Sequence, residues 1–571
     1  MKRMAVALSL LGVLGTAALS NGEPDVWVSL CGTDNVPGSQ YDLTRALSAG
    51  GTVRFDCGGQ TKLRVTFTHE IAGVVTIDGG GVMTLTGDDL QSLFRLRQGA
   101  RLTLRNVTIT GGKDPRPHPL PFPGSSTPVT DEHRVQDGGV IQNAYGGDIL
   151  IQSSELRANT GPIRTVGGSL TIRDSFFTDN RATAIKAYGA RVEIERSHFW
   201  NNEAGFFGGA LLVSGGTLVI RDRTEFIGNR GYVGGALAAW GPSELERVTF
   251  FGNRALHGGA IQVTSGESLE IRHGRFEANV ATLDGGAVYR SNASNGVAPR
   301  LFITHTNFVK NTARDGGAIA MAPGSVANDG MLTLRNVIFS QNEASRNGGA
   351  VAVGGMGVDV AQSIFLGNEA AVQGGALFLQ LENFHARGSR VVNSLLARNH
   401  APGGGAALAI LPPWINLFRF PIYGSRVHFI NSTIADNAGD GIRVVKQQIM
   451  PTWTPVLLAN TIVAGNAGEN CGGPTFWNEG HNLQFPGATC GTSIPAGPPL
   501  FGPYYVPIAW SPARGRGDDA VCAAQPIDKK DLFGETRSLP GPCTIGAIER
   551  EIDRLVRRRS DDRPQDRPPD R

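Results

Sequence analysis

The sequence has few of the features that identify most enzymes and nucleic-acid-binding proteins. Its formal net charge is only +3 over 571 residues, so nothing in the charge balance predicts nucleic-acid binding. It contains no HExxH, GxSxG or GxxxxGK motif and no calcium-binding nonapeptide run. Zinc-protease, serine-hydrolase, P-loop and calcium-repeat chemistry are therefore not indicated. We expect no cofactor.

Cysteine is also scarce, with six residues and no CxxC pair. The six fall into three local pairs near the ends of the chain, Cys31 with Cys57, Cys471 with Cys490, and Cys522 with Cys543. In an exported protein such pairs are most simply disulfides that pin the caps. A metal site is a weaker alternative, because His481 is the only histidine near a pair.

Long apolar runs are absent except at residues 4–19, which follow two basic residues. This layout is typical of a cleaved secretory signal at residues 1–20. A membrane anchor is the alternative, although the run is short for a span. We expect cleavage near Ser20, no membrane span in the mature chain, and a secreted or cell-surface location.

A repeated motif organises most of the remaining chain. An apolar residue is followed three positions later by Asn, and a Gly-Gly-Ala-aliphatic string follows after a short gap. The asparagines are Asn159, Asn180, Asn202, Asn229, Asn253, Asn279, Asn311, Asn342, Asn368, Asn399, Asn437 and Asn466. The Gly-Gly strings begin at Gly208, Gly234, Gly258, Gly285, Gly316, Gly348 and Gly374.

Repeats of twenty to forty residues, built from short β-prone runs, predict a β-solenoid. Each coil cannot bury its inward side chains alone, so neighbouring coils must stack. Phe at one place per coil then forms an internal stack, and Asn at a turn forms a ladder. We predict an all-β, single-stranded parallel β-helix. Its right hand is expected because left-handed parallel crossovers are rare.

The chain divides around this repeat. A short helix at Tyr41–Ala49 is expected to cover the first coil and its exposed edge, and residues 21–110 form the N-terminal cap and first coils, with one strand-like run at Leu102–Ile109. Residues 111–137 are Pro-rich and predict a loop insertion. Residues 138–466 carry the repeats, 467–549 the last coils and cap, and 550–571 a disordered charged tail.

The FxxN and GGA[ILV] pairing resembles the polymorphic outer-membrane protein repeat, found on right-handed parallel β-helices of the pectin-lyase-like superfamily. The ends, LTRALSAGGTVRF and the NC…GHNL…C…C…IGAIE segment, are similar to those of bacterial exported β-helix proteins. The resemblance implies a surface or secreted protein, often adhesive and often without known activity. Autotransporting members carry a C-terminal barrel, and we expect none in this chain.

Catalytic chemistry is best sought at the residue before each Gly-Gly pair. If these positions stack, His257, Asp284 and Asp315 lie on successive coils, with Arg314 and Arg346 beside them. Two carboxylates at this spacing would share a proton, bind a cation, or act as acid and nucleophile on a glycoside. The alternative is that they are solvated polar turn residues.

A binding platform is the second candidate. Aromatic residues gather in two insertions, Trp414, Phe418, Phe420 and Tyr423 in the first and Trp453 in the second. They form either a platform that stacks on sugar rings or docks a protein, or a cluster that packs the loops onto the solenoid wall. Asp78, Asp88 and Asp89 are further acidic positions, most simply explained as turn residues.

Taken together, these patterns favour an exported, non-enzymatic protein that binds polysaccharide or another cell-surface component, as an adhesin does. The first alternative is a polysaccharide lyase or glycoside hydrolase that uses Asp284 and Asp315. The second is a purely structural rod.

Overall fold

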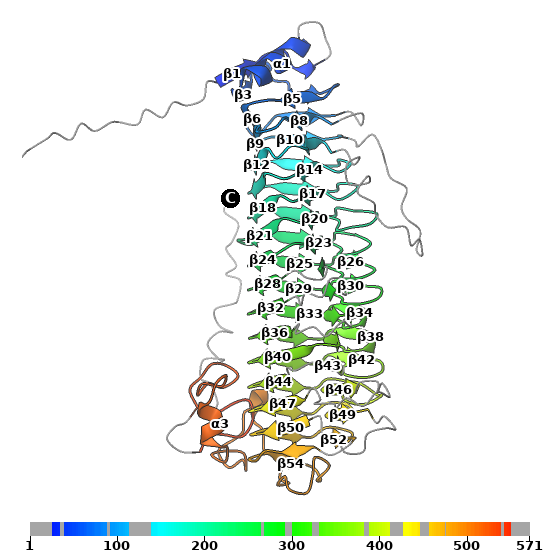
Figure 1. The fold of residues 1–571 in the computed structure, drawn as a ribbon, viewed down its shortest axis with the longest axis vertical. Coiled ribbons are helices and arrows are strands. Elements are labelled where there is room, and N and C mark those ends of the chain that lie inside the picture. The colour runs from blue at the N-terminus through cyan, green and yellow to red at the C-terminus, as the bar shows by residue number, and fades with distance from the viewer. Residues whose placement is uncertain are drawn as a thin grey trace, which may run out of the picture.

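Each coil of the chain contributes three short strands, and the coils stack along one axis (Figure 1). The computed structural model describes residues 25–34, 39–87, 92–112, 139–263, 268–291, 300–322, 331–381, 388–411, 426–445, 456–473, 476–537 and 542–549. Over these residues the chain is a right-handed parallel β-helix, as the repeat predicts. The secretory signal, the body of the Pro-rich insertion and the C-terminal tail lie outside the described residues.

Sheet A contains the first strand of each coil, and its inward positions alternate with outward ones. Its strands are β1 (Asp25–Val28), β3 (Gly51–Phe55), β6 (Val74–Asp78), β9 (Arg101–Arg105), β12 (Asp148–Gln152), β15 (Ser169–Arg173), β18 (Arg191–Glu195), β21 (Thr217–Arg221), β24 (Ser243–Glu246), β28 (Leu269–Arg272), β32 (Arg300–Thr304), β36 (Met331–Arg335), β40 (Gly357–Ala361), β44 (Ser389–Val392), β47 (Val427–Ile430), β50 (Val456–Ala459) and β53 (Trp477–Asn478).

Sheet B follows after a sharp corner, and most of its strands have three residues with the middle one inward. Its strands are β2 (Gly32–Thr33), β4 (Lys62–Arg64), β7 (Thr84–Thr86), β10 (Thr108–Thr110), β13 (Glu155–Arg157), β16 (Phe176–Thr178), β19 (His198–Trp200), β22 (Glu225–Ile227), β25 (Thr249–Phe251), β29 (Arg275–Glu277), β33 (Asn307–Val309), β37 (Ile338–Ser340), β41 (Ile364–Leu366), β45 (Leu395–Ala397), β48 (Thr433–Ala435), β51 (Ile462–Ala464) and β54 (Leu483–Phe485).

Sheet C closes each coil, and a short sheet D lines the path between sheets B and C. The strands of sheet C are β5 (His69–Ile71), β8 (Phe94–Leu96), β11 (Ile141–Asn143), β14 (Ile163–Val166), β17 (Ile185–Tyr188), β20 (Leu211–Ser214), β23 (Leu237–Trp240), β27 (Ile261–Val263), β31 (Val288–Arg290), β35 (Ile319–Met321), β39 (Val351–Gly354), β43 (Leu377–Gln380), β46 (Leu408–Leu411), β49 (Ile442–Val444) and β52 (Cys471–Gly472). Those of sheet D are β26 (Arg254–Ala255), β30 (Val280–Ala281), β34 (Thr312–Asp315), β38 (Glu343–Asn347) and β42 (Glu369–Ala370).

The repeated Phe and Asn form two internal columns. Rings from Phe177 to Phe365 stack coil on coil, with centroids 4.6 to 5.0 Å apart. From Asn159 to Asn466 the side-chain Nδ2 of each Asn donates to Oδ1 of the next at 2.8 to 3.3 Å. Both columns are buried. The motif therefore specifies the core and one corner of every coil.

The Gly-Gly string lies where the chain turns into sheet C. Gly285 has φ of +67°, a backbone conformation that disfavours L side chains, and a Cβ on Gly286 would lie 2.0 Å from the carbonyl oxygen of Gly317. The first glycine permits the turn, and the second permits close approach of successive coils.

The corner between sheets A and B corrects one prediction. The run Leu102–Ile109 is not one strand, because Asn106 has a φ of 51° and separates β9 from β10. A non-glycine residue occupies the left-handed region at this corner in coil after coil. Just after it lies a column of hydroxyl groups, and the Oγ of Ser175, for example, accepts from the N–H of Ser154 at 3.2 Å.

The N-terminal cap contains α1 (Ser39–Ala49), which contacts β1, β3 and β5. Leu43, Ala46 and Leu47 are buried, as their helical spacing predicts. The Asp42 carboxylate accepts from the N–H groups of Ser29 and Leu30 at 2.7 and 2.9 Å. These bonds fasten the helix to the end of β1.

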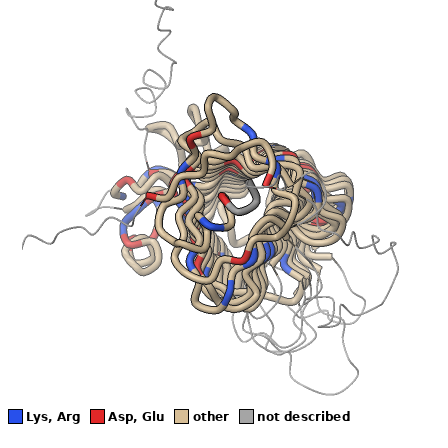
Figure 2. The backbone as a smooth tube through the Cα atoms, turned by 90° about the horizontal axis from the view of Figure 1, so that it is seen from above, with Lys and Arg blue, Asp and Glu red and all other residues tan. Residues whose placement is uncertain are grey.

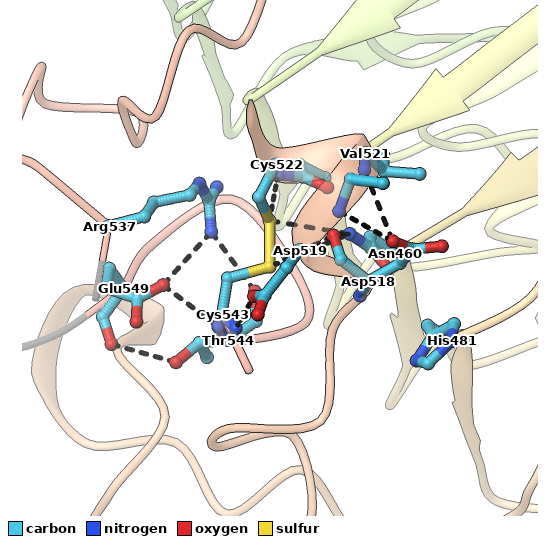
Figure 3. Close-up of a disulfide and its surroundings, with 12 residues drawn as sticks. Asn460, His481, Asp518, Asp519, Val521, Cys522, Arg537, Cys543, Thr544 and Glu549 are labelled. Atoms are coloured by element: carbon cyan, nitrogen blue, oxygen red, sulfur yellow. Dashed lines mark hydrogen bonds and ion pairs between the residues drawn. A yellow bond between two sulfur atoms is a disulfide. The ribbon is translucent and has the colours of Figure 1, made fainter. Parts of the chain in front are cut away.

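All three cysteine pairs predicted from the sequence form disulfides. Cys31–Cys57 lies in the N-terminal cap and Cys471–Cys490 joins β52 to the segment after β54. Cys522–Cys543 lies beside the solenoid, next to Asn460 and Asp518 (Figure 3). It belongs to a segment, here called the C-terminal clasp, made of residues 500–537 and 542–549.

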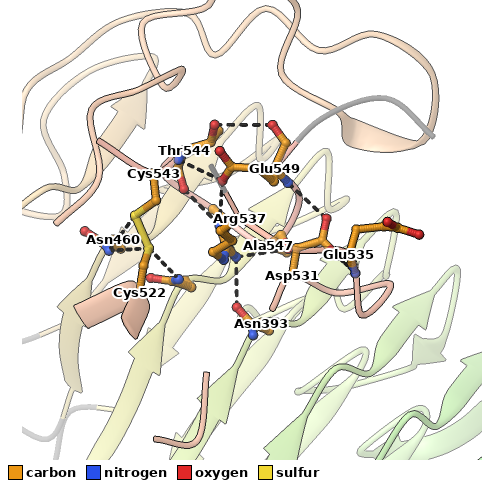
Figure 4. A network of polar contacts seen from close by, with 12 residues as sticks. Asn393, Asn460, Cys522, Asp531, Glu535, Arg537, Cys543, Thr544, Ala547 and Glu549 are labelled. Carbon is orange, nitrogen blue, oxygen red and sulfur yellow. Dashed lines mark hydrogen bonds and ion pairs between the residues drawn. A yellow bond between two sulfur atoms is a disulfide. The ribbon is translucent and has the colours of Figure 1, made fainter. Parts of the chain in front are cut away.

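The clasp includes η1 (Pro503–Tyr505) and α3 (Asp519–Ala523), and α3 lies beside the last coils (Figure 1). It covers an apolar part of the outer face of sheet B, where Leu395, Ala397 and Ala435 contact its residues. Arg537 is fully buried and donates to Asn393 Oδ1 at 2.8 Å and Glu549 Oε2 at 3.3 Å (Figure 4). This end of the chain is therefore fastened to the wall, not only to the open end.

Candidate functional site

The predicted acidic residues lie on adjacent coils. Asp284 and Asp315 form a parallel bridge pair just before their Gly-Gly turns. Asp284 contacts His257 of the preceding coil, with 3.2 Å between Oδ2 and Nδ1. The structure therefore brings together the three residues that the repeat register aligns.

Both carboxylates are paired with arginine. Arg314 Nη2 donates to Asp284 Oδ1 at 3.0 Å and Arg314 Nε to Asp315 Oδ2 at 3.1 Å. Arg346 Nε donates to Asp315 Oδ1 at 2.8 Å. The residues form a ladder of alternating charge across four coils, here called the charge ladder: His257, Asp284, Arg314, Asp315 and Arg346.

The electrostatics of Asp284 do not suit a proton donor. Burial raises its pKa, but the contact with His257 and the charge of Arg314 outweigh burial, and its pKa is lowered. A glycosidase acid needs a raised pKa. The catalytic assignment of Asp284 and Asp315 stays a prediction, and the geometry favours a structural role for the pair.

Asp78 is likewise held by cations on neighbouring coils. Its Oδ2 contacts Arg54 and Arg105, each at 3.1 Å, and its Oδ1 accepts from Asn106 at 3.2 Å. Burial raises its pKa, but hydrogen bonds from Gly80 and Asn106 and the two arginine charges leave it lowered. Asp78 therefore links the first coils, and Asp88 and Asp89 lie outside the described residues.

The predicted aromatic platform, residues 414–423 with Trp453, also lies outside the described residues. The charged residues do not indicate another ligand-binding surface, because Lys, Arg, Asp and Glu are distributed around the perimeter of the coils (Figure 2). Within the described ranges, no three His, Cys, Asp or Glu side chains are arranged to hold a metal ion. None of the described helices is long and apolar enough to cross a membrane.

A groove of about 560 Å³ lies on the outer face of sheet A. It crosses β21, β24, β28, β32 and β36, which follow one another along the rod (Figure 1). Its lining residues are Thr217, Leu218, Val219, Pro242, Ser243, Glu244, Ser268, Leu269, Glu270, Arg300, Phe302, Met331 and Thr333. Unlike the charge ladder, it is a concave surface on a rigid scaffold, the usual form of a ligand site.

The groove lies over a position where the wall has less side-chain volume. Ser243 takes the inward position that Leu218 and Leu269 occupy in the adjoining coils. Its hydroxyl donates to the Gly241 carbonyl at 2.9 Å, which satisfies the buried polar group. The groove thus lies over the coil with the smallest inward residue of these three.

Outward side chains give the groove its chemistry. Glu244, Glu270 and Phe302 are in register on three consecutive strands. The Glu270 Oε1 accepts from Arg272 at 2.5 Å, whereas Glu244 is 58% exposed and lies 3.8 Å from Arg221. Phe302 is 36% exposed. The groove combines an aromatic face with hydrogen-bond acceptors that reach solvent.

The sequence does contain a signal for this groove. Glu244, Glu270 and Phe302 occupy the same outward position on three aligned strands. Arg300 occupies the preceding outward position on β32. The Gly-Gly turns do not indicate these outward positions, which lie on other strands of the coil. The outward residues share a column only when every coil is placed in the same register.

No family model and no curated protein matches the chain. Among solved structures, the chain is similar to the catalytic unit of a thermostable GH87 alpha-1,3-glucanase from Streptomyces thermodiastaticus. The sequence identity is 12% and the TM-score 0.34, with 82% of this chain and 70% of that chain covered. A likeness at this level carries no argument about what this chain binds or does.

Proposed function

We propose that the protein is an exported, non-enzymatic β-helix protein that binds polysaccharide at the cell surface or outside the cell, in the groove on sheet A. The observation that carries this proposal is the groove itself, with Phe302 beside Glu244 and Glu270 on consecutive strands. An aromatic ring offers a face to the C–H side of a sugar, and carboxylates accept from its hydroxyl groups.

The direction of the groove suits a chain molecule. It runs across strands, and therefore along the rod axis. Five strands at about 4.8 Å spacing span roughly 19 Å. Each coil then offers equivalent positions at a spacing comparable with the length of one sugar unit, so a linear polysaccharide would contact several coils at once.

Export is supported by the three disulfides, which are typical of oxidising compartments. The signal-like residues 1–20 are consistent with it. The adhesin-like part of the proposal rests on the resemblance of the FxxN and GGA[ILV] pairing to the polymorphic outer-membrane protein repeat.

A second candidate function is glycoside hydrolysis in the same groove. Glu244 and Glu270 are direct partners on adjacent strands, and the strand spacing of about 4.8 Å is close to the separation of about 5–5.5 Å between the carboxyl groups of retaining glycosidases. The pairing of Glu270 with Arg272 favours binding over acid catalysis.

The test is a glycan-array binding assay on the purified protein, with mass spectrometry of every polysaccharide that binds. Phe302→Ala and Glu244→Gln/Glu270→Gln are compared with Asp284→Asn/Asp315→Asn. We expect the groove variants to lose binding at least tenfold, the ladder variant to keep it, and no product to form. Shortened or unsaturated products that vanish with Glu244→Gln/Glu270→Gln would show that the protein is an enzyme. If the wild type binds no glycan, the result would favour the alternative that the protein is a purely structural rod.

A further inference from the structure

The residue after each ladder asparagine, from Asn159 to Asn437, lies on the path between sheets B and C, and none of these residues is buried. Parallel pairing joins them from coil to coil without a break. The middle members belong to the strands of sheet D, β26, β30, β34, β38 and β42 (Figure 1). We call the set the post-Asn column: Thr160, Arg181, Glu203, Arg230, Arg254, Val280, Thr312, Glu343, Glu369, His400 and Ala438.

Charge divides this column into two halves. The first half has three arginines and one glutamate, and the second half has two glutamates and one histidine. Val280 and Thr312, which are neutral, separate the halves. The net charge is therefore +2 in the first half, three cations less one anion, and −2 in the second half with a neutral histidine. A basic strip is followed by an acidic strip on the same face of the rod.

The charges of the column are available to a partner. All seven ionisable side chains of the column are exposed. Glu369 contacts His400 at 3.3 Å, and these two side chains are still 58% and 47% exposed. The other five form no ion pair with any residue that the structure describes: Arg181, Glu203, Arg230, Arg254 and Glu343.

The order of charges along the column is complementary to its own reverse. If two copies lie antiparallel about a two-fold axis that passes between Val280 and Thr312, members at equal distances from the axis face each other. Two kinds of arginine–glutamate pair form, each of them twice, and no like charges meet. The facing pairs, counted outward from the axis, are Val280 with Thr312, Arg254 with Glu343, Arg230 with Glu369, and Glu203 with His400.

Other arrangements of two copies lose this complementarity. An axis that passes through Val280 sets Glu203 against Glu369, which places two like charges together. An axis that passes through Thr312 leaves Arg254 with Glu369 as the only arginine–glutamate pair. A parallel pair, with the axis along the rod, sets every arginine against its own copy, and like charges that face each other are costly. The column therefore specifies both a direction and a register.

Apolar neighbours and the length of the column also suit a protein interface. Tyr232, in the coil of Arg230, stacks on Phe206 with ring centroids 5.5 Å apart. In the antiparallel register it faces Val372, which lies in the coil of Glu369 and is 44% exposed. Exposed ion pairs contribute little affinity by themselves, and this apolar contact adds to them. The ten steps of the column span roughly 48 Å, so a strip ~17 Å wide supplies the ~800 Å² per partner of a standard interface.

We propose that the chain forms an antiparallel homodimer along the post-Asn column. The charged pairs give the dimer its direction and register, and the apolar neighbours add affinity. Because the column lies between sheets B and C, the groove on sheet A is outside the contact. Dimer formation does not depend on what the groove binds.

Sedimentation velocity of the full chain over a range of concentrations, at about 0.05 M and about 0.5 M NaCl, tests the dimer. The variants are Arg230→Glu and Glu369→Arg, measured separately and as an equimolar mixture. Arg95→Glu is the matched control, because Arg95 is an exposed arginine on β8, outside the column. Thermal melting confirms that every variant is folded.

The wild type is expected to be a dimer whose dissociation constant rises at least tenfold at the higher salt concentration. Each single variant places like charges together at two contacts, so we expect its dimer to be at least tenfold weaker. The mixture is expected to recover dimers of wild-type affinity, because the Arg230→Glu chain and the Glu369→Arg chain present opposite charges to each other at both contacts. Arg95→Glu should dimerise as the wild type does.

Cross-linking measures the direction of the pair. Glu203 of one copy faces His400 of the other, whereas the two copies of Glu203 are seven coil steps apart, roughly 34 Å. A short bis-maleimide is therefore expected to join Glu203→Cys chains to His400→Cys chains and not to join Glu203→Cys chains to each other.

A monomer at every concentration would overturn the dimer. Single variants that dimerise as tightly as Arg95→Glu would also overturn it, because the column would then not form the contact. Failure of the mixture to recover dimers, or cross-linking of Glu203→Cys chains to one another, would overturn the antiparallel register. Polysaccharide binding by a monomeric wild type would keep the proposed function, so the dimer and the proposed function can fail separately.

Discussion

Arg314 joins two coils by donating to Asp284 of the coil before it at 3.0 Å. Its Nε simultaneously contacts Asp315 of its own coil at 3.1 Å, so one guanidinium bridges both carboxylates that the sequence offers as a catalytic pair. The charge of Arg314 contributes to the lowered pKa of Asp284, so Asp284 does not readily donate a proton. The arrangement is better suited to holding coils together than to cleaving a glycoside.

Asp315→Asn is expected to lower the stability of the rod without affecting binding. Asp315 is 11% exposed and accepts from two arginines, and hydrogen bonds to charged groups contribute about 1.5–3 kcal/mol when well shielded. Because Arg314 and Arg346 are themselves 39% and 54% exposed, we expect a loss of only about 1 kcal/mol. Urea unfolding measures it, with Glu277→Gln as the exposed-pair control. Polysaccharide cleavage by the wild type that Asp315→Asn abolishes at unchanged stability would restore the catalytic hypothesis.

Acid is expected to weaken the rod at Asp359. Burial raises the pKa of this carboxyl, but hydrogen bonds from Arg390 and Arg335 outweigh burial, and the folded-state pKa is lowered. The stabilisation is therefore complete above the unfolded pKa of about 3.9 and is lost as pH falls through the folded value. Melting curves of wild type and Asp359→Asn should differ at neutral pH and converge in acid. A difference that grows on acidification would contradict this sign.

Most of the fold could be predicted from the sequence because its signals are periodic. The Phe and Asn columns follow from the FxxN spacing, and the Gly-Gly string marks the turn into sheet C. The run Leu102–Ile109 is an exception, because strand propensity does not show that Asn106 takes a left-handed conformation in the middle of it. A corner formed by a single residue hardly changes the local amino-acid composition, so composition does not reveal it.

The candidate site was harder to predict, since it depends on which outward residues share a column. Glu244, Glu270 and Phe302 are separated by 26 and 32 positions in the chain and meet only through strand register. Unequal loop lengths hide such columns in the sequence.

Asn279→Ala is expected to lower the stability of the protein far more than the small loss of side-chain volume suggests. Asn279 is fully buried, donates to the Phe250 carbonyl and to Asn311 Oδ1, and accepts from the backbone N–H of Asn253. Leaving these buried groups unpaired costs about 1–3 kcal/mol each. We expect the free energy of unfolding to fall by roughly 3 kcal/mol or more, measured by denaturant titration.

The control for this variant lies in the adjacent coil. Asn307→Ala removes the same amide from an outward, half-buried position on β33, so its effect should stay within about 0.5 kcal/mol. Equal losses from the two substitutions would show that the ladder has no special role in stability.

Opening the Cys522–Cys543 disulfide is expected to release the C-terminal clasp and leave the solenoid intact. The bridge closes a segment of 21 residues, for which chain-entropy estimates give a stabilisation of about 3 kcal/mol. The clasp is also held by corner amides, since Asn393 donates to the Lys530 carbonyl and Asn460 to the Asp518 carbonyl. Buried Arg537 and the apolar contacts with sheet B add to these bonds, and without the bridge all of these contacts must hold the segment.

Hydrogen exchange of Cys522→Ser/Cys543→Ser measures the consequence. Exchange should accelerate in residues 518–537 and in β45 and β48, whose Leu395 and Ala435 lose their cover, while β12 to β36 keep wild-type protection. Cys31→Ser/Cys57→Ser is the matched control and should affect only the N-terminal cap. Because each coil contacts only its neighbours, damage at one end is expected to stay there. Faster exchange along the entire rod would show that the clasp stabilises the solenoid as a whole, contrary to this expectation.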